Sequence, residues 1–245
     1  MNYKIRLPGT MFRRARPSFV LTAFLLLRLA TSLRADDHYL APGHPDGVAL
    51  LAPPPASGSA EEAADLAEVR LVFKARTPAE ESRAKQEQGL SFSLFEPAIG
   101  PVFQSGKLPR TDALLKKVKK EIGEAINIPK EHWKRLRPYQ MDAELTFSQP
   151  EKDFGYPSGH STRGTVYALV LAEIFPEKRD AIMAIGRDIG WDRVLIGKHF
   201  PTDVQAGRVL GKAIVRELME SPAFQHDLAA AKAEAQAAQS QPAVR

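Results

Sequence analysis

The chain has 245 residues, 44% of them hydrophobic and 26% charged, so it can bury a core and is neither wholly disordered nor collagenous. It has no cysteine, which excludes disulfides, cysteine-ligated zinc, iron–sulfur clusters and a thiol nucleophile. The net charge of +5 comes from residues 1–35, which carry seven Lys or Arg and no acid; the other 210 residues carry 27 Lys or Arg against 29 Asp or Glu, which removes the support for a nucleic-acid partner.

The first 35 residues have the pattern of an export signal. A basic stretch, residues 1–16, precedes a mostly apolar stretch of ten residues from Ser18 to Leu27. Ten residues suit the apolar part of a signal peptide and are too few to span a bilayer. We therefore predict a signal peptide over residues 1–35, cleaved after Ala35, with an uncleaved anchor helix as the alternative. The mature protein is then periplasmic or secreted and is not embedded in the membrane.

Residues 36–58 predict an irregular, loose N-terminal arm, because the run Pro53–Pro54–Pro55 favours an extended backbone. His38 and His44 lie in this arm. We interpret both as solvent-exposed loop residues, with metal binding as the alternative.

From residue 59 onward apolar residues recur with a helical period, and no alternating strand pattern competes with it. Ser59 with Glu62, and Thr77 with Glu80, have the spacing of capping boxes. The first two expected helices begin at residues 59 and 77, and Gly89 stops the second. A third helix is capped by Thr111, and a fourth begins at Pro129 and ends near Arg137, before Pro138. Further helices are expected at residues 158–175, 177–195 and 201–220 and from Ser221, with a short buried turn at residues 92–99 and a loop at residues 139–157.

These elements predict a single all-α domain, a compact helical bundle over residues 59–222. The arm precedes it, and a C-terminal helix with a frayed Ala/Gln tail, residues 223–245, follows it.

Two short segments favour an anion site with a histidine nucleophile. Ser158 and Gly159 precede an apolar helix, whose free N–H groups can bind an anion, with His160 in the first turn; a simple helix cap is the alternative. His199 and Asp203 are one helical turn apart, so the carboxylate can fix the imidazole tautomer and leave the other nitrogen free to attack. A surface His–Asp pair is the alternative.

A third segment and the residue that opens the His–Asp segment supply positive charge. Arg137 and Arg193 can each grip a phosphate through two N–H groups, and Lys130 adds a point charge. Three cations can offset a bound phosphate dianion and the charge that builds during nucleophilic attack. A metal site formed by His160, His199 and Asp203 is a further alternative, but the neighbouring cations oppose a metal ion.

The three segments together resemble the signature of the phosphatidic acid phosphatase type 2 superfamily. They read KxxxxxxRP, PSGH and RxxxxxHxxxD in that order, and the similarity extends over about residues 48–220 to the soluble bacterial class A non-specific acid phosphatases. The resemblance implies an all-α fold of the acid phosphatase and vanadium haloperoxidase type. It also implies hydrolysis of small phosphate monoesters through a phosphohistidine, with broad specificity and without a cofactor or a metal.

The resemblance also implies a role for each residue of the motifs. His199 is expected to be the nucleophile, Asp203 its orienting partner, and His160 the acid that protonates the leaving oxygen. The expected phosphate-binding residues are Lys130, Arg137, Ser158, Gly159 and Arg193.

One position departs from the family pattern. Asp192 stands immediately before the third-motif arginine, where the family usually has serine. An added carboxylate beside an anion pocket should weaken phosphate binding unless Arg187, Arg193 or Lys198 neutralises it.

Other functions stay open at this point. A vanadate-dependent haloperoxidase would use a similar pocket, but the chain is short for one and shows no halide site. A non-catalytic phosphate-binding protein is compatible with Asp192. A membrane lipid phosphatase would need several spanning helices, which the sequence lacks. Assembly into a homo-oligomer is also left open.

Overall fold

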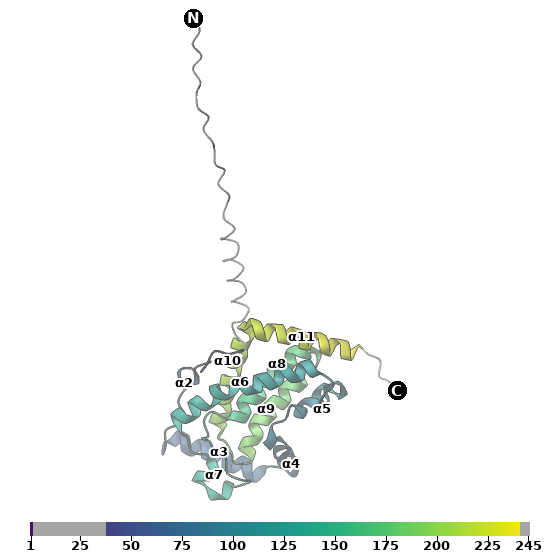
Figure 1. Cartoon of the computed structure of the whole chain (residues 1–245). Helices are drawn as coiled ribbons and strands as arrows, with labels where there is room; N and C mark the ends of the chain where they lie inside the picture. The colour runs from purple at the N-terminus through teal and green to yellow at the C-terminus, as the bar shows by residue number, and fades with distance from the viewer. Residues whose placement is uncertain (2–37, 241–245) are drawn as a thin grey trace. The chain divides into compact units, whose positions relative to one another are not determined.

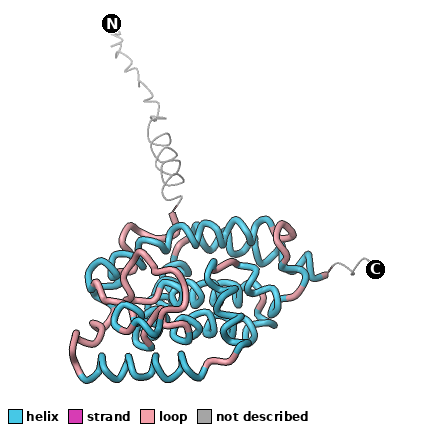
Figure 2. Tube along the Cα trace, turned by 90° about the horizontal axis from the view of Figure 1, so that it is seen from below, coloured by secondary structure: helices cyan, strands magenta, loops and turns pink. Residues whose placement is uncertain are grey.

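The computed structural model describes Met1 and residues 38–240, and this part of the chain consists of helices joined by loops, without a strand (Figures 1 and 2). The predicted signal segment, beyond Met1, and the last five residues lie outside the described residues. The predicted all-α fold is therefore confirmed for residues 38–240. The α-helices are α2 (Gly47–Leu50), α3 (Ala60–Ala75), α4 (Pro78–Gln86), α5 (Glu96–Ile99), α6 (Pro109–Trp133), α7 (Pro138–Met141), α8 (Gly159–Ile174), α9 (Arg179–Leu195), α10 (Pro201–Glu220) and α11 (Pro222–Gln239). Short 3-10 turns are η1 (Glu87–Gly89), η2 (Phe92–Phe95), η3 (Pro101–Phe103), η4 (Ala143–Leu145) and η5 (Pro176–Lys178).

Helix α8 is the central element of the bundle. Residues 164–172 of this helix carry no charge, as expected of a segment with protein all around it, and Val166, Ala168 and Leu171 are fully buried. Helices α9 and α10 pack on it, while α11 packs along α6 (Figure 1). Since α8 begins directly after its N-cap Ser158, the burial of this helix fixes the position of the PSGH segment.

Glycines allow α9 and α10 to approach α8 closely. A Cβ added to Gly186 of α9 would lie 2.6 Å from the Ala168 Cβ and 2.8 Å from the Gly164 carbonyl oxygen. A Cβ on Gly207 of α10 would lie 2.7 Å from the Ser158 carbonyl oxygen. Real Cβ atoms do not come this close to other atoms, so any larger residue at either position would push the helices apart.

The N-terminal arm is fastened to the bundle rather than loose. Tyr39 is buried, and its backbone N–H donates to Glu121 of α6 at 2.6 Å. Its hydroxyl donates to Asp227 of α11 at 2.5 Å, and its ring meets the Phe224 ring edge-on. The prediction of a loose arm is therefore wrong for residues 38–51, although the imidazoles of His38 and His44 are mostly exposed as expected.

The predicted break at Pro129 is wrong. Helix α6 runs without interruption from Pro109 to Trp133 and ends where Lys134 adopts a left-handed φ of 47°. Proline removes only the bond to the Ala125 carbonyl, and the apolar stripe of the helix continues into the core on both sides of it.

Four other local predictions also need correction. Thr111 lies inside the first turn of α6 and donates to Glu234, so it is not the cap; the N-cap position belongs to Leu108. Glu62 accepts from the Gly58 N–H, so the box at Ser59 is half formed, whereas the box at Thr77 is complete. The segment of residues 139–157 contains the helical turns α7 and η4. Helix α11 does not fray before Gln239, because Ala231 and Ala235 pack in the core.

The turn after α4 also ends differently from the prediction. Gly89, predicted to stop this helix, is the last residue of η1, and the left-handed φ of 38° belongs to Leu90. Leu90 is buried, so packing of its side chain holds a conformation that glycine would adopt more easily.

Candidate active site

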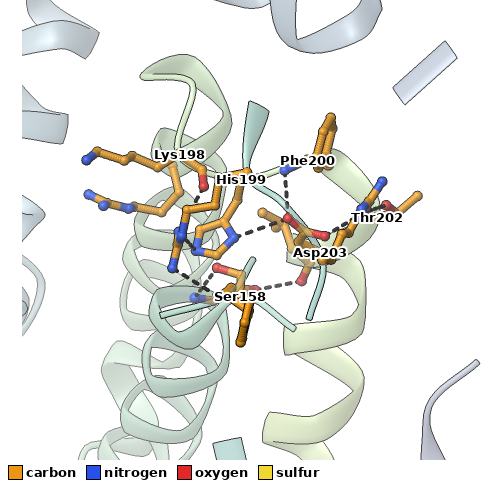
Figure 3. A network of polar contacts seen from close by, with 12 residues as sticks. Ser158, Lys198, His199, Phe200, Thr202 and Asp203 are labelled. Carbon is orange, nitrogen blue, oxygen red and sulfur yellow. Dashed lines mark hydrogen bonds and ion pairs between the residues drawn. The ribbon is translucent and has the colours of Figure 1, made fainter. Parts of the chain in front are cut away.

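The three sequence segments meet at the N-terminal ends of α8 and α10. Lys130 lies in the last turn of α6, Arg137 directly before α7, and Arg193 in the last turn of α9. Every one of the eight residues singled out from the sequence belongs to this one place: Lys130, Arg137, Ser158, Gly159, His160, Arg193, His199 and Asp203. Figure 3 shows His199 between Asp203, Ser158 and the backbone of Lys198.

Three cations line the site and are almost completely buried. The side chains of Lys130, Arg137 and Arg193 are only 2–3% exposed. Burial lowers the pKa of Lys130 to about 8 and that of Arg193 to about 10. The Nε and Nη1 atoms of Arg193 have no hydrogen-bond partner among the described residues. Buried donors without a partner are rare, so these two nitrogens are suited to donate to an anionic ligand.

The contacts of His199 fix its tautomer. Arg137 Nη1 lies 3.0 Å from Nε2, and since arginine only donates, Nε2 must accept and carries the lone pair. The proton is therefore on Nδ1, which donates to Asp203 Oδ2 at 3.2 Å (Figure 3). Burial and then Arg137 hold the pKa of His199 well below its usual value. The imidazole is thus neutral, with a lone pair directed at the cations.

Asp203 is held by more than His199. It is fully buried, and Oδ2 also accepts from the Phe200 N–H at 3.0 Å. Its second oxygen accepts from Arg135 Nη1 at 2.5 Å, and Arg135 Nη2 donates to Asp65 Oδ2 at 2.8 Å. Burial raises the pKa of Asp203 to about 6, against the opposing effect of Arg135. Arg135 and Asp65 were not predicted; Arg135 lies inside the first motif and resembles any surface cation in the sequence.

His160 faces the site from the first turn of α8. Its Nε2 lies 3.4 Å from the Gln88 carbonyl oxygen of η1. Burial and then Arg193 lower its pKa to about 3, so the ring is neutral when no anion is bound. A bound dianion would offset the charge of Arg193 and favour the protonated ring.

The start of α8 brings backbone N–H groups to the same place. Ser158 is the N-cap, and its Oγ accepts from Ser161 N at 3.3 Å. Its own N–H donates to the Asp203 carbonyl oxygen at 3.0 Å, which joins α8 to α10. Gly159 is buried, and a Cβ there would lie 3.8 Å from Lys130 Cε, so the lysine stem passes close to the helix start. Helix N-termini favour anions at such a position.

Asp192 is neutralised by a residue that was not predicted. Arg83 of α4 binds it with two hydrogen bonds, each of 2.7 Å, and Asp192 is fully buried. The expected partners Arg187, Arg193 and Lys198 make none of these bonds. Burial and then Asp192 raise the pKa of the adjacent Glu87 to about 8, so Glu87 is neutral below that pH. The carboxylate thus belongs to a structural pair between α4 and α9.

Replacing Asp192 with serine should therefore not improve the enzyme. We expect KM to change by less than about twofold and the free energy of unfolding to fall by about 1–3 kcal/mol, because Arg83 and Glu87 lose their partner. Steady-state kinetics and urea unfolding measure the two effects. Arg83→Met is the matched control, and it should destabilise at least as much, because it leaves Asp192 buried without a cation. A several-fold lower KM at unchanged stability would instead show that Asp192 opposes the anion.

The loop between η4 and α8 contributes two further residues that were missed. Asp153 contacts Lys130 and Arg137, and Glu151 contacts Arg193. The sequence places both acids in a loop, where exposed carboxylates are common and carry no signal of a partner. Four cations, counting the buried Lys198, face these two carboxylates, so the site keeps a positive excess.

The arrangement suits covalent chemistry on an anion. It combines a neutral imidazole lone pair, buried cations with free N–H groups, a helix N-terminus and a second histidine. Among residues 38–240, no three histidines and carboxylates are grouped as the ligands of a metal ion would be. No helix in this range has the length and hydropathy of a membrane span.

Comparison with known proteins identifies relatives over most of the chain. Residues 122–226 match the PAP2 superfamily. The non-specific acid phosphatase of Providencia stuartii is 32% identical over 199 residues, covering 77% of this chain and 80% of that protein. An acid phosphatase of Zymomonas mobilis subsp. mobilis is 29% identical over 200 residues, covering 78% and 76%. Among solved structures, a transmembrane PAP2-type phosphatidylglycerolphosphate phosphatase from Bacillus subtilis aligns with a TM-score of 0.47 at 20% identity, over 82% of this chain and 94% of that one.

Proposed function

Because this chain belongs to the PAP2 superfamily and is a phosphoric monoester hydrolase, we propose that it transfers the phosphoryl group of small phosphate monoesters to His199 and then to water, without a metal ion. The observation that carries this proposal is the pair of unsatisfied nitrogens, Nε and Nη1, on buried Arg193, beside an imidazole whose Nε2 lone pair contacts Arg137. A phosphate dianion supplies the missing acceptors.

Binding uses the buried cations and the start of α8. Phosphate oxygens accept from Arg193 Nε and Nη1, from Arg137 and Lys130, and from N–H groups at Gly159. Arg137 already touches His199 Nε2, so an anion that binds Arg137 has its phosphorus next to the nucleophile. The cations are fixed by burial before substrate arrives, which lowers the cost of reorganisation in the transition state.

In the first step His199 Nε2 attacks phosphorus and the bond from phosphorus to the leaving oxygen breaks. His160 gives its proton to that oxygen, and the alcohol leaves. Asp203 accepts the hydrogen bond of Nδ1–H and offsets the positive charge of the phosphorylated ring. In the second step His160 takes a proton from water as the water oxygen attacks phosphorus. The phosphorus–nitrogen bond breaks, and its electron pair returns to Nε2.

The proton for the first step is supplied with the substrate. His160 is neutral in the free enzyme, with a pKa of about 3. A phosphate monoester monoanion carries one proton, which it loses with a pKa near 6. Neutral His160 with a monoanion has the same proton count as protonated His160 with a dianion, so the proton can pass to the ring on binding. Activity should therefore fall as the pH rises through about 6, which gives an acidic to near-neutral optimum.

We further propose that the protein is exported, to the periplasm or the medium, and accepts many phosphate monoesters. Export rests on the signal pattern of residues 1–35, which lie outside the described residues except for Met1. Broad specificity is supported by the relative named non-specific acid phosphatase. By sequence, Asp192 favoured a non-catalytic role. Its ion pair with Arg83 removes that support.

Turnover of p-nitrophenyl phosphate in excess EDTA tests the proposal. We expect the rate to be unchanged within error, because the anion is bound by fixed cations, and orthovanadate to inhibit as a mimic of five-coordinate phosphorus. An enzyme that loses its activity in EDTA and regains it with a divalent ion would contradict the mechanism. Bromide oxidation by peroxide in the presence of vanadate is the assay for the haloperoxidase alternative.

Replacing His160 with alanine should separate two kinds of substrate. Alkyl phosphates need a proton on the leaving alkoxide, so kcat should fall by about 10²–10⁴-fold. p-Nitrophenyl phosphate has a stable phenolate as its leaving group and should lose about tenfold or less. The pH dependence above 6 should flatten in the variant for alkyl substrates. Equal losses on both substrates would assign His160 to phosphate binding instead.

A further inference from the structure

The loop that leads into α8 carries two carboxylates inside the anion site. Asp153 Oδ2 lies 3.0 Å from Lys130 Nζ, and Asp153 Oδ1 lies 2.7 Å from Arg137 Nη2. Glu151 Oε1 lies 2.9 Å from Arg193 Nη2 and 3.8 Å from Lys198 Nζ. Two acids, separated by one residue, are thus paired with every cation expected to hold phosphate.

These acids differ from their cationic partners in exposure. The side chains of Asp153 and Glu151 are 47% and 37% exposed, whereas the three cations expected to bind phosphate are 2–3% exposed. A half-exposed carboxylate can turn into water at little desolvation cost, while a buried cation cannot follow it. The acids are therefore the mobile partners, and the cations stay in place.

We propose that Asp153 and Glu151 are affinity-determining residues, internal anions that compete with the phosphate group of the substrate for Lys130, Arg137 and Arg193. The inference rests on the proposed function, because it takes the cation cluster to be the phosphate site. It goes beyond it by assigning two residues outside the three motifs.

The two carboxylates should weaken phosphate binding whether or not the loop moves. If the carboxylates turn outward, phosphate binding must first break their ion pairs. If they remain, they repel the oxygens of a phosphate that is bound to the same cations. In both cases removing a carboxylate frees donors on buried cations and should tighten phosphate binding. The same competition would speed the release of product phosphate.

Calorimetric titration with inorganic phosphate tests the proposal on the full-length protein. We expect Asp153→Asn to lower the Kd for phosphate by about fivefold, and Glu151→Gln by a similar or smaller factor, as estimated from the value of a partly exposed ion pair. Glu144→Gln is the charge-matched control, because Glu144 lies exposed on the same connection and should not change the Kd. An unchanged or higher Kd in both Asp153→Asn and Glu151→Gln would overturn the proposal.

A further control separates charge from loop position. The Glu151 N–H donates to the Tyr139 hydroxyl at 3.0 Å, which anchors the loop without any charge. Tyr139→Phe removes this anchor and keeps both acids, so its Kd should stay within about twofold of the wild type. A fivefold drop in Tyr139→Phe equal to that in Asp153→Asn would attribute the effect to loop position and contradict the role of charge.

Two measurements keep the outcomes distinct. If a variant is too unstable for calorimetry, the rise of Tm with added phosphate reports the same affinity, and it should be larger for Asp153→Asn than for the wild type. Phosphate binding needs no turnover. Tighter binding in a protein that hydrolyses nothing would therefore refute the proposed function alone, and equal binding in a protein with normal turnover would refute this inference alone.

Discussion

Replacing His199 with alanine should lower kcat by four orders of magnitude or more and abolish the phosphoenzyme. Its Nε2 carries the lone pair that contacts Arg137. The chain has no cysteine that could act as the nucleophile instead. Loss of an essential nucleophile has effects of this size in other covalent enzymes. The measurement is rapid acid quench after mixing with labelled substrate, followed by detection of the acid-labile adduct.

The control for this experiment is His226→Ala. The His226 side chain is 83% exposed and lies on α11, so the variant should form the adduct at the wild-type level. His199→Ala should still bind phosphate, because Arg193 and Lys130 are retained. An adduct in His199→Ala would show that the nucleophile is another residue.

Replacing Arg135 with methionine should be among the most destabilising changes at residues other than the eight predicted site residues. Arg135 is 4% exposed and lies between the buried carboxylates of Asp65 and Asp203. Removing it leaves two buried acids without their cation, which should cost about 3–5 kcal/mol in the free energy of unfolding. Urea unfolding near pH 7 measures the loss. kcat should fall as well, because Asp203 would no longer be fixed as the acceptor of the His199 proton.

A double variant separates the charge effect from lost packing. Arg135→Met with Asp65→Asn removes one of the two stranded charges and should recover part of the stability, although Asp203 still lacks its partner. The guanidinium of Arg135 also lies over the Phe200 ring, with Cζ 4.0 Å from the ring centroid, and both variants lose this contact equally. If the single variant lost less than about 1 kcal/mol in the free energy of unfolding, the ion pairs of Arg135 with Asp65 and Asp203 would contribute little to the stability of the fold.

The family and the fold could be predicted from the sequence because their signals are local or are carried by motifs. The PSGH segment marks a helix start. The comparisons confirm the membership of the PAP2 superfamily that the three motifs together indicated. The structure brings the eight predicted residues together, while their individual roles stay predictions until the variants are measured.

The missed features depend on partners far apart in the chain. Arg83 and Asp192 are separated by 109 positions, and Arg135 and Asp65 by 70. No periodicity or cap signal connects such residues, so an acid beside the motif appeared to be unpaired. The continuous α6 has the same kind of cause: packing of its apolar stripe outweighs the single hydrogen bond that Pro129 removes.

The hydrogen bond between Tyr39 of the N-terminal arm and Asp227 of α11 constrains the order in which the chain can fold. The hydroxyl of Tyr39 and the carboxylate of Asp227 are 188 positions apart, so this bond closes a loop that includes nearly the whole bundle. Contacts of such long range form late, because the entropy of closing the loop must be lost before the contact stabilises anything. A chain still being synthesised lacks α11, so the Tyr39 hydroxyl cannot bond to Asp227 until this last helix has emerged. Until then the arm can be joined to α6, where Glu121 accepts from the Tyr39 and Leu40 N–H groups, but not to α11.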